Sequence, residues 1–284
     1  MSTIGFIGAG TTGTALAVRL AQQGYQIVAV SSRSLASAEK LAGRVSGCKS
    51  YKTTQEAADT AQIVFITTPD DVISQVVAEI NWHNRQNVVH CSGAHSADIL
   101  ETAKQNGANT GCFHPLQTFA NIEQAIKNIP RSTFAIEAEE PLFTVLKDMA
   151  IALEGDWVAL KPGDKVLYHA AAVFACNYLV TLVKLSTDMW KTFGVEPAQA
   201  TKALMPLLQG TLSNIENIGL PNCLTGPIAR GDVGTIIKHL DALKEDSPSL
   251  LETYKELGTQ TIPIALDKGK IDSEKAKELQ TLLK

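Results

Sequence analysis

The chain has 284 residues, of which 25 are Lys or Arg and 29 are Asp or Glu, so its formal net charge is −4. This length allows two domains, each with a substantial core. The slight acidity and the lack of a basic run argue against a nucleic-acid-binding protein and favour a small-molecule partner. Five cysteines without a C-x-x-C pair, and no signal peptide before the first predicted strand, predict a cytoplasmic protein.

The first predicted elements are a strand, a glycine turn and a helix. An apolar run at residues 3–7 leads into Gly8-Ala9-Gly10-Thr11-Thr12-Gly13, and an amphipathic helix at 14–23 precedes a second apolar run at 26–30. A G-x-G-x-x-G turn in this βαβ setting is typical of dinucleotide binding. The glycines permit a tight turn, close approach of the backbone to a pyrophosphate and tight helix packing, while the helix N-terminus offers free N–H groups. We therefore predict that all six turn residues contact the cofactor.

The residues after the second predicted strand indicate which dinucleotide is bound. An NAD site usually has an Asp or Glu at this point, which binds the ribose hydroxyls. This chain has Ser31-Ser32-Arg33-Ser34 instead, with no carboxylate until Glu39. A guanidinium among hydroxyls suits the 2′-phosphate of NADP(H), so we predict that cofactor, bound by all four residues. The alternative is that Arg33 is a solvated turn residue.

Strands and helices alternate as far as residue 160, and only helices are predicted after Pro162-Gly163. The alternation predicts a Rossmann fold, an α/β domain with a doubly wound parallel sheet. The later strands are expected at 49–52, 62–67, 87–90, 110–114, 132–136 and 156–160. The C-terminal helices are expected at 165–193, 197–218, 232–243, 248–266 and 273–283. We assign residues 1–161 to an NADP-binding domain and 162–284 to an all-α domain for substrate binding and dimerisation.

The first helix of that second domain is apolar on nearly all sides. Residues 166–183 contain no Asp, Glu, Lys or Arg, but they include His169, Asn177 and two tyrosines, so a buried helix is favoured over a membrane span. A helix that is apolar all round is expected to be buried all round. Packing against a second copy of the chain would bury it, and we therefore expect a homodimer.

Polar residues follow three of the predicted strands, at the sheet edge where ligands of open α/β sheets bind. Thr67-Thr68-Pro69 is expected to flank the nicotinamide ribose and the pyrophosphate. His90-Cys91-Ser92-Gly93 and the segment 113–119, FHPLQTF, are expected to border the nicotinamide ring and the substrate.

Carbonyl reduction needs a hydride, a proton and donors that hold the substrate. His114 can supply the proton because imidazole titrates near neutral pH, and Ser92 can donate to a substrate oxygen. The structural alternatives are a strand-end histidine bonded to backbone and a serine that caps a turn. The nearby His and Cys residues lack the spacing of a zinc site, so we expect no metal.

Two segments of the helical domain add candidates. His169 and Asn177 point roughly 80° apart at about 100° per residue, so both can face one cleft, or each can bond to a neighbouring helix. Arg230 lies in the segment 224–232, LTGPIARGD. It can clamp a carboxylate or pair with an acidic neighbour.

These motifs resemble those of two-domain, Rossmann-like NADP oxidoreductases whose C-terminal helical half is a domain of unknown function. The matching segments are GAGTTG at 8–13, HCSG at 90–93, FHPLQTF at 113–119 and LTGPIARGD at 224–232. The resemblance extends to a superfamily with 6-phosphogluconate dehydrogenase, pyrroline-5-carboxylate reductase and ketopantoate reductase. Part of the family resembles an alternative type of ketopantoate reductase that serves pantothenate biosynthesis.

The resemblance implies a substrate cleft between an NADP-binding domain and a helical dimerising domain. Its motif positions correspond here to Ser92, His114, Gln117, Thr225 and Arg230, of which we assign the last three to substrate binding. Many superfamily members carry a Lys-x-x-x-Asn pair whose lysine donates the proton. Asn177 can match that Asn, but Val173 occupies the lysine position. The donor would then be His114 or His169.

Three functional hypotheses follow. The first is NADPH-dependent reduction of a small 2-oxo acid, with ketopantoate as the named substrate and His114, His169, Ser92 and Asn177 as the catalytic residues. The second is reduction of a cyclic imine, as in pyrroline-5-carboxylate reduction, which needs no strong acid because the iminium arrives protonated. The third is a non-catalytic NADP-binding sensor or assembly protein.

Overall fold

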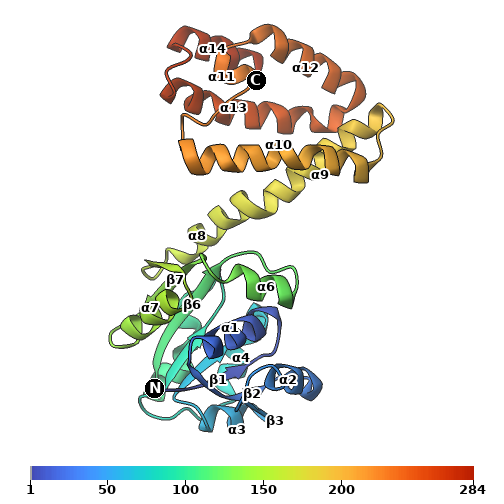
Figure 1. Cartoon of the computed structure of the whole chain (residues 1–284). Helices are drawn as coiled ribbons and strands as arrows, with labels where there is room; N and C mark the ends of the chain where they lie inside the picture. Colours follow the sequence, from blue (N-terminus) through green and yellow to red (C-terminus); the bar gives the residue numbers. More distant parts are fainter. Residues whose placement is uncertain (1) are drawn as a thin grey trace. The chain divides into compact units, whose positions relative to one another are not determined.

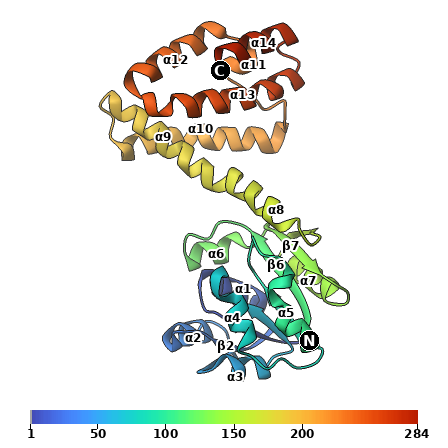
Figure 2. The same ribbon diagram turned by 180° about the vertical axis from the view of Figure 1, so that it is seen from behind.

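The protein is described by a computed structural model over residues 2–284, and its chain divides into two compact units. The first unit ends at Cys176 and the second runs from Asn177 to Lys284 (Figure 1; Figure 2). The predicted division between residues 161 and 162 lies earlier, in the turn before the helix that begins at Lys165. It stays a prediction about where the two functions separate.

An eight-stranded sheet forms the centre of the first unit, in the order β3-β2-β1-β4-β5-β6-β7-β8. All neighbouring strands are parallel except β6 and β7, which confirms the predicted Rossmann-like class. The strands are β1 Thr3–Ile7, β2 Gln26–Ser31, β3 Lys49–Tyr51, β4 Ile63–Ile66, β5 Asn87–His90, β6 Asn109–Leu116, β7 Thr133–Ala138 and β8 Asp156–Ala159.

Strand β7 departs from the predicted all-parallel sheet. It pairs antiparallel with β6, and its first residue, Thr133, lies opposite Leu116 at the end of β6. The chain therefore re-enters the sheet at the edge where it left. The connection carries helix α6 (Ile122–Asn128), which packs beside α1. Alternation along a sequence predicts strands and helices but not the direction of a strand that returns at the same edge.

Helices cover both faces of the sheet (Figure 1; Figure 2). One face packs against α1, α2, α6 and α7 and holds the larger apolar core, while the other packs against α3, α4 and α5. The helices are α1 Thr11–Gln22, α2 Leu35–Ala42, α3 Thr54–Asp59, α4 Ile73–Ala78, α5 Glu101–Gln105 and α7 Leu142–Ala152, with 3-10 turns at Asp70–Val72 and Ala97–Leu100.

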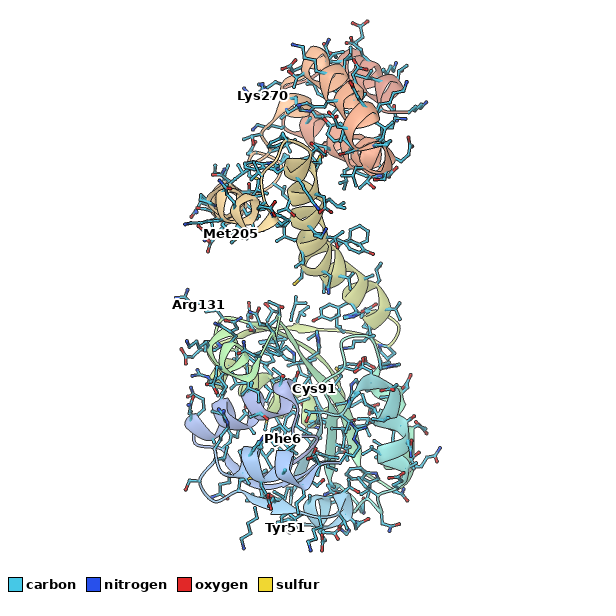
Figure 3. All side chains as sticks on the ribbon, turned by 90° about the vertical axis from the view of Figure 1, so that its right-hand side faces the viewer. Phe6, Tyr51, Cys91, Arg131, Met205 and Lys270 are labelled. Carbon is cyan, nitrogen blue, oxygen red and sulfur yellow. The ribbon has the colours of Figure 1, made fainter. Side chains whose placement is uncertain are left out.

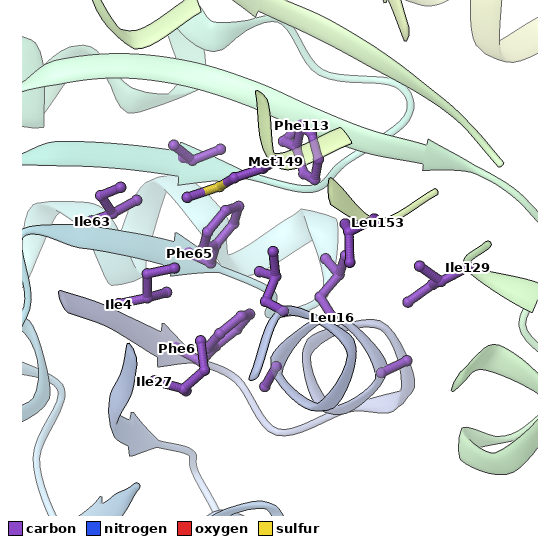
Figure 4. Close-up of a cluster of buried hydrophobic side chains, with 14 of the residues drawn as sticks. Ile4, Phe6, Leu16, Ile27, Ile63, Phe65, Phe113, Ile129, Met149 and Leu153 are labelled. Carbon is purple, nitrogen blue, oxygen red and sulfur yellow. The ribbon is translucent and has the colours of Figure 1, made fainter. Parts of the chain in front are cut away.

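Four buried phenylalanines cross the larger core from strand to strand. The ring centroids of Phe6 and Phe65 lie 5.2 Å apart, those of Phe65 and Phe113 6.1 Å, and those of Phe113 and Phe134 4.5 Å. Figure 4 shows the first three rings in the same apolar cluster as Leu16 of α1. Aromatic pairs at such separations add to the stabilisation from burial alone. The stack ties β1, β4, β6 and β7 together, which holds the polar ends of β1, β4 and β6 at one edge.

The described part of the second unit is entirely helical, as predicted. Its apolar core is formed by α11 to α14 and contains Ile228, Ile236, Ile262 and Leu279. The helices are α9 Tyr178–Thr192, α10 Pro197–Ile218, α11 Pro227–Arg230, α12 Val233–Asp246, α13 Leu251–Asp267 and α14 Ser273–Leu282, with a 3-10 turn at Pro248–Leu250.

The helix predicted at 165–193 is present but is not buried. It consists of α8 (Lys165–Ala172), a π-helical turn (Val173–Asn177) and α9. Burial on all sides is wrong for the single chain, because Leu167, Phe174 and Val180 are 78%, 72% and 70% exposed. Among the described residues, only Lys165–Thr192 is long and apolar enough to cross a membrane by length and composition.

Candidate functional site

The glycine turn after β1 is braced against the end of β4. Gly8 has φ +107, and a Cβ on it would lie 2.6 Å from the carbonyl carbon of Thr67. A Cβ on Gly13 would lie 2.6 Å from the carbonyl oxygen of Gly8 and would overlap the hydroxyl of Thr67. That hydroxyl donates to the Gly8 carbonyl at 2.8 Å. Two glycines are therefore required by packing, independently of any ligand.

Gly10 has a different environment, which fits a bound pyrophosphate. A Cβ built on Gly10 would meet no atom within 4 Å. The missing side chain therefore leaves room outside the protein, where a ligand can approach the backbone. Gly10 is also the N-cap of α1, and no side chain caps that terminus. The first helical hydrogen bond runs from the Thr14 N–H to the Gly10 carbonyl, which leaves the preceding N–H groups free for an anion.

The segment after β2 contains one cationic side chain, Arg33, which is available to a ligand. Arg33 is exposed and forms no ion pair within residues 2–284. The hydroxyl of Ser34 accepts from the Ser37 N–H at 3.4 Å and caps α2, while the buried hydroxyl of Ser31 has no protein partner. Ser31, Ser32 and Arg33 are thus the side chains of this segment that remain available to the cofactor, and Arg33 is the one that suits a 2′-phosphate.

At the end of β4, Thr67 holds the glycine turn in place, while the hydroxyl of Thr68 has no partner in the described chain. Thr67 uses its hydroxyl to hold the glycine turn, as described above. The hydroxyl of Thr68 is buried without a partner in the described chain. A buried unpartnered hydroxyl costs free energy unless a ligand satisfies it. Thr68 therefore fits a cofactor contact better than Thr67 does.

Ser92 is buried and its hydroxyl is fully used inside the protein. It donates to Oδ2 of Asp70 at 2.6 Å and accepts from the N–H groups of Ala94 and His95, both at 3.2 Å. Its own N–H donates to Nδ1 of His90 at 3.1 Å. The geometry favours the structural alternative, in which Ser92 shapes the HCSG loop, over a direct bond to substrate.

Two predicted histidines converge beside Gly93. The space that a Cβ of Gly93 would occupy lies 2.8 Å from Nε2 of His114 and 2.7 Å from Nδ1 of His169. Tyr168, the residue before His169, lies 2.8 Å from Nδ1 of His114 through its hydroxyl. Nδ1 of His169 is buried and has no partner in the described chain. These groups form a polar cluster that packs closely around Gly93, where a side chain would have no room.

Lys165 is a member of this cluster that the sequence analysis missed. It is only 1% exposed, and its Nζ donates to the Ser92 carbonyl at 2.8 Å and to Sγ of Cys112 at 3.0 Å. Nζ also lies 5.4 Å from the ring centroid of Tyr168. Lysine at the first position of a helix is disfavoured by the helix dipole, and this was the available sequence signal of a special role.

Burial keeps the surrounding groups uncharged, and at the two histidines His90 and His114 the charge of Lys165 adds to this effect. Burial first, then Lys165 and His169, lower the pKa of His114 to about 3. The expectation that His114 titrates near neutral pH is therefore wrong. Burial and Lys165 likewise lower the pKa of His90 to about 3. Burial raises the pKa of Cys112 to about 11, against the opposing effect of Lys165, and also raises the pKa of Tyr168.

The other predicted site residues lie outside this cluster. Gln117 is exposed, and its Nε2 bonds to the Asn128 carbonyl at 3.3 Å, which holds the β6–α6 connection. Asn177 is exposed at the end of the π turn, so the angle computed from α-helical geometry does not apply. Thr225 and Arg230 belong to the second unit, around α11. No group of three or more potential metal ligands is found among the described residues.

Two family models match the sequence. Residues 3–93 match the family described as NADP oxidoreductase coenzyme F420-dependent, and residues 132–261 match a domain of unknown function, DUF2520. The matches confirm NADP(H) as the cofactor and confirm the predicted pairing of a Rossmann-like half with a C-terminal domain of unknown function. Neither match is specific to ketopantoate reductase. No curated protein matches the sequence.

Three solved structures that share the fold are informative. A candidate NADP oxidoreductase from Bacteroides fragilis is 25% identical, with a TM-score of 0.70 over 92% of this chain and 98% of that one. A reductive aminase from Aspergillus terreus, solved with NADPH and ethyl-5-oxohexanoate, is 16% identical, with a TM-score of 0.63 over 100% of this chain and 92% of that one. 1-Pyrroline-5-carboxylate reductase from Streptococcus pyogenes is 16% identical, with a TM-score of 0.62 over 99% of this chain and 98% of that one. The chain therefore has the fold of imine and pyrroline-5-carboxylate reductases, and its residues 3–93 match a family of NADP oxidoreductases.

Proposed function

We propose that this oxidoreductase uses NADPH to reduce the carbon–nitrogen double bond of a small imine. One observation carries the choice: Nε2 of His114 lies against Gly93 in the polar cluster, and with a pKa of about 3 this histidine is neutral at pH 7. Reduction of a ketone needs a proton for the developing alkoxide, whereas an iminium brings its proton with it. Two solved structures of the same fold belong to proteins named as a reductive aminase and a pyrroline carboxylate reductase.

The chain's own residues would bind and orient the imine, while NADPH would supply the hydride. If the Tyr168 hydroxyl donates to Nδ1 of His114, the neutral imidazole carries its proton on Nε2, which lies beside Gly93. That N–H would hold an electronegative substrate atom. The unpartnered Nδ1 of His169 would accept a hydrogen bond from the N–H of an iminium.

We retain the other predicted contacts within this proposal. Ser92 would act by holding the HCSG loop through Asp70 rather than by touching substrate. Asn177, Gln117, Thr225 and Arg230 are proposed to bind the polar groups of a substrate that also carries a carboxylate. Substitution of each should raise the KM for such a substrate, because each substitution removes a hydrogen bond to a polar or charged group of the substrate.

Reduction of a small 2-oxo acid, with ketopantoate as the test substrate, is the second candidate. It is favoured by Lys165, a buried side chain whose hydrogen-bond partners, Ser92 and Cys112, are neutral groups. Its positive charge would stabilise an alkoxide or a carboxylate nearby and would disfavour an iminium.

Turnover measurements separate these candidates. We expect NADPH absorbance to fall with 1-pyrroline-5-carboxylate or another cyclic imine, and kcat/KM to be at least tenfold lower with ketopantoate. The reverse order would select the oxo acid reductase. His114→Phe should reduce kcat about 100-fold, as loss of one preorganised donor does. Tight NADPH binding with no turnover across both substrate classes would instead identify a cofactor-binding sensor or assembly protein.

We also propose that the protein acts as a homodimer in the cytoplasm. The proposal rests on the exposed apolar side chains of α8, α9 and α10, such as Leu167, Val180 and Leu207. Exposed apolar surface on this scale marks an interaction face. Five scattered cysteines, an odd number, suit a reducing compartment.

A further inference from the structure

A cavity of about 390 Å³ opens in the second unit, beside α11 and the segment after α13. Three of its lining side chains are cationic and none is a carboxylate. Lys270, one of the three, is labelled in Figure 3. The lining consists of Leu224, Thr225, Gly226, Ala229, Arg230, Lys268 and Lys270.

Lys268 is held in place by neutral partners. Its Nζ donates to the carbonyl oxygen of Asn222 at 2.8 Å and to that of Leu224 at 2.7 Å. These bonds fix the loop before α11 and use two of the three ammonium protons. Because both acceptors are neutral, the positive charge of Lys268 stays uncompensated at the wall of the cavity.

Arg230 keeps most of its donors free. Its only ion pair within residues 2–284 is to Oδ2 of Asp232 at 3.8 Å, which is too long for a hydrogen bond. The carboxylate of Asp232 is already used to cap α12, since it accepts from the N–H of Thr235 at 3.1 Å and from its hydroxyl at 2.8 Å. The side chain of Arg230 is 65% exposed and can turn toward a ligand.

The remaining polar groups of the cavity are free as well. In the described chain, neither the Thr225 hydroxyl nor Nζ of Lys270 has a hydrogen-bond or ion-pair partner. Gly226 has φ +101, and a Cβ on it would meet no atom within 4 Å, so the backbone itself borders open space. Three like charges around one cavity repel each other unless an anion lies between them.

We infer that this cavity binds a compact dianion, either a phosphate group or a pair of carboxylates on a small molecule. The planar guanidinium of Arg230 offers paired donors to one anionic group, and the two lysines add point charges. The sequence predicted Thr225 and Arg230 as substrate contacts. Lys268 and Lys270 extend that pair into a site with its own charge preference. Because Thr225 and Arg230 are also proposed substrate contacts, the inference rests in part on the proposed function, but all of these residues lie in the second unit and the binding test needs no turnover.

Calorimetry on the full chain tests the site with two probes, inorganic phosphate and malonate. NADP⁺ is kept saturating, so that the dinucleotide turn is filled, and potassium chloride holds the ionic strength constant. We expect at least one probe to bind in the millimolar range or tighter. The Arg230→Gln/Lys270→Gln double variant should weaken binding at least tenfold, because it removes charged donors. Lys202→Gln, which removes an exposed charge of α10, should bind like the wild type.

The outcomes are distinguishable. Binding of phosphate alone indicates a phosphorylated ligand, and binding of malonate alone indicates a dicarboxylate. The inference fails if neither probe binds, or if acetate binds as tightly as phosphate and malonate do. It also fails if the double variant binds the probes like the wild type while its circular dichroism shows a folded protein. Absence of reductase turnover would not affect any of these results.

Discussion

Gly93 is the residue on which the polar cluster depends, because its missing side chain lets two histidine side chains approach its backbone closely. A Cβ there would lie 2.7 Å from Nδ1 of His169 and 2.8 Å from Nε2 of His114. We predict that Gly93→Ala lowers kcat for the productive imine about 100-fold, since the rings must move off their donor positions. NADPH affinity, measured by fluorescence titration, should change little. Gly210→Ala, at an open position in α10, is the control and should leave kcat unchanged.

Arg33 is the residue that should distinguish NADPH from NADH. Its guanidinium is exposed and without an ion pair in the described chain, so it is free to bind the 2′-phosphate. We predict that Arg33→Gln weakens NADPH binding by about 10- to 100-fold, because a charged hydrogen bond contributes about 1.5–3 kcal/mol. The Kd for NADH should stay the same. Arg85→Gln removes an exposed charge elsewhere and serves as control; equal loss of both cofactors in Arg33→Gln would contradict the assignment.

The residues that could be predicted are those whose chemistry is local in sequence. The glycine turn and Arg33 follow from spacing alone. The polar cluster depends on contacts that no spacing reveals: Tyr168 meets His114 from 54 residues away, and Lys165 meets Cys112 from 53. The sequence also did not reveal that the hydroxyl of Ser92 is used by Asp70.

The turn between β1 and α1 behaves as one element in which neighbouring glycines have separate physical roles. A Cβ on Gly13 would contact Gly8 and overlap Thr67, whereas a Cβ on Gly10 would enter open space. We predict that Gly13→Ala lowers the free energy of unfolding by about 1–3 kcal/mol through overpacking, and weakens NADPH binding as well. Gly10→Ala should weaken NADPH binding at least tenfold while urea unfolding of the cofactor-free protein stays within about 0.5 kcal/mol of the wild type.

Equal destabilisation by both substitutions would contradict this division of roles.

At the scale of secondary-structure elements, strand and helix positions could be predicted well from apolar periodicity. The direction of β7 could not, because it is fixed by where α6 packs after β6. The π turn at Val173–Asn177 also has no marker in an apolar run.

For the whole molecule, buried His90 and half-buried His114 make the free energy of unfolding depend on pH. The pKa of His90 and that of His114 are both lowered from 6.5 to about 3 in the fold, by burial first and then by Lys165. The unfolded chain therefore binds more protons than the native one between these values, and stability present above pH 6.5 is lost as the pH falls. We predict a loss of about 1.4 kcal/mol per pH unit per histidine below pH 6.

Urea unfolding at pH 6.0, 5.5 and 5.0 measures this slope. Both His114→Phe and His114→Asn should remove roughly half of the histidine contribution, whatever their effect on stability at pH 7, because one of two titrating groups is gone. A slope unchanged in both variants would show that His114 is not held neutral by the fold.

The single chain leaves apolar side chains of α10 exposed, which predicts that it assembles with a second copy. Leu207 and Ile215 of α10 are 67% and 45% exposed, although a helix of a folded protein normally buries its apolar face. We predict that light scattering at micromolar concentration gives twice the chain mass of 30.4 kDa for the wild type. Leu207→Lys/Ile215→Lys should give a folded monomer, because unpaired charges in an apolar interface cost several kcal/mol.

The control for this prediction is Gln199→Lys, which adds the same charge to an exposed polar position of α10 and should stay dimeric. A monomeric wild type that instead sediments with lipid vesicles would assign the helix Lys165–Thr192 to a membrane. Lys165 argues against that outcome, since its ammonium is bonded to Ser92 and Cys112 and ties the first turn of α8 to the sheet. Inserting that turn into a bilayer would break both bonds and carry a charge into hydrocarbon, at a cost of about 2.5–3.5 kcal/mol or more.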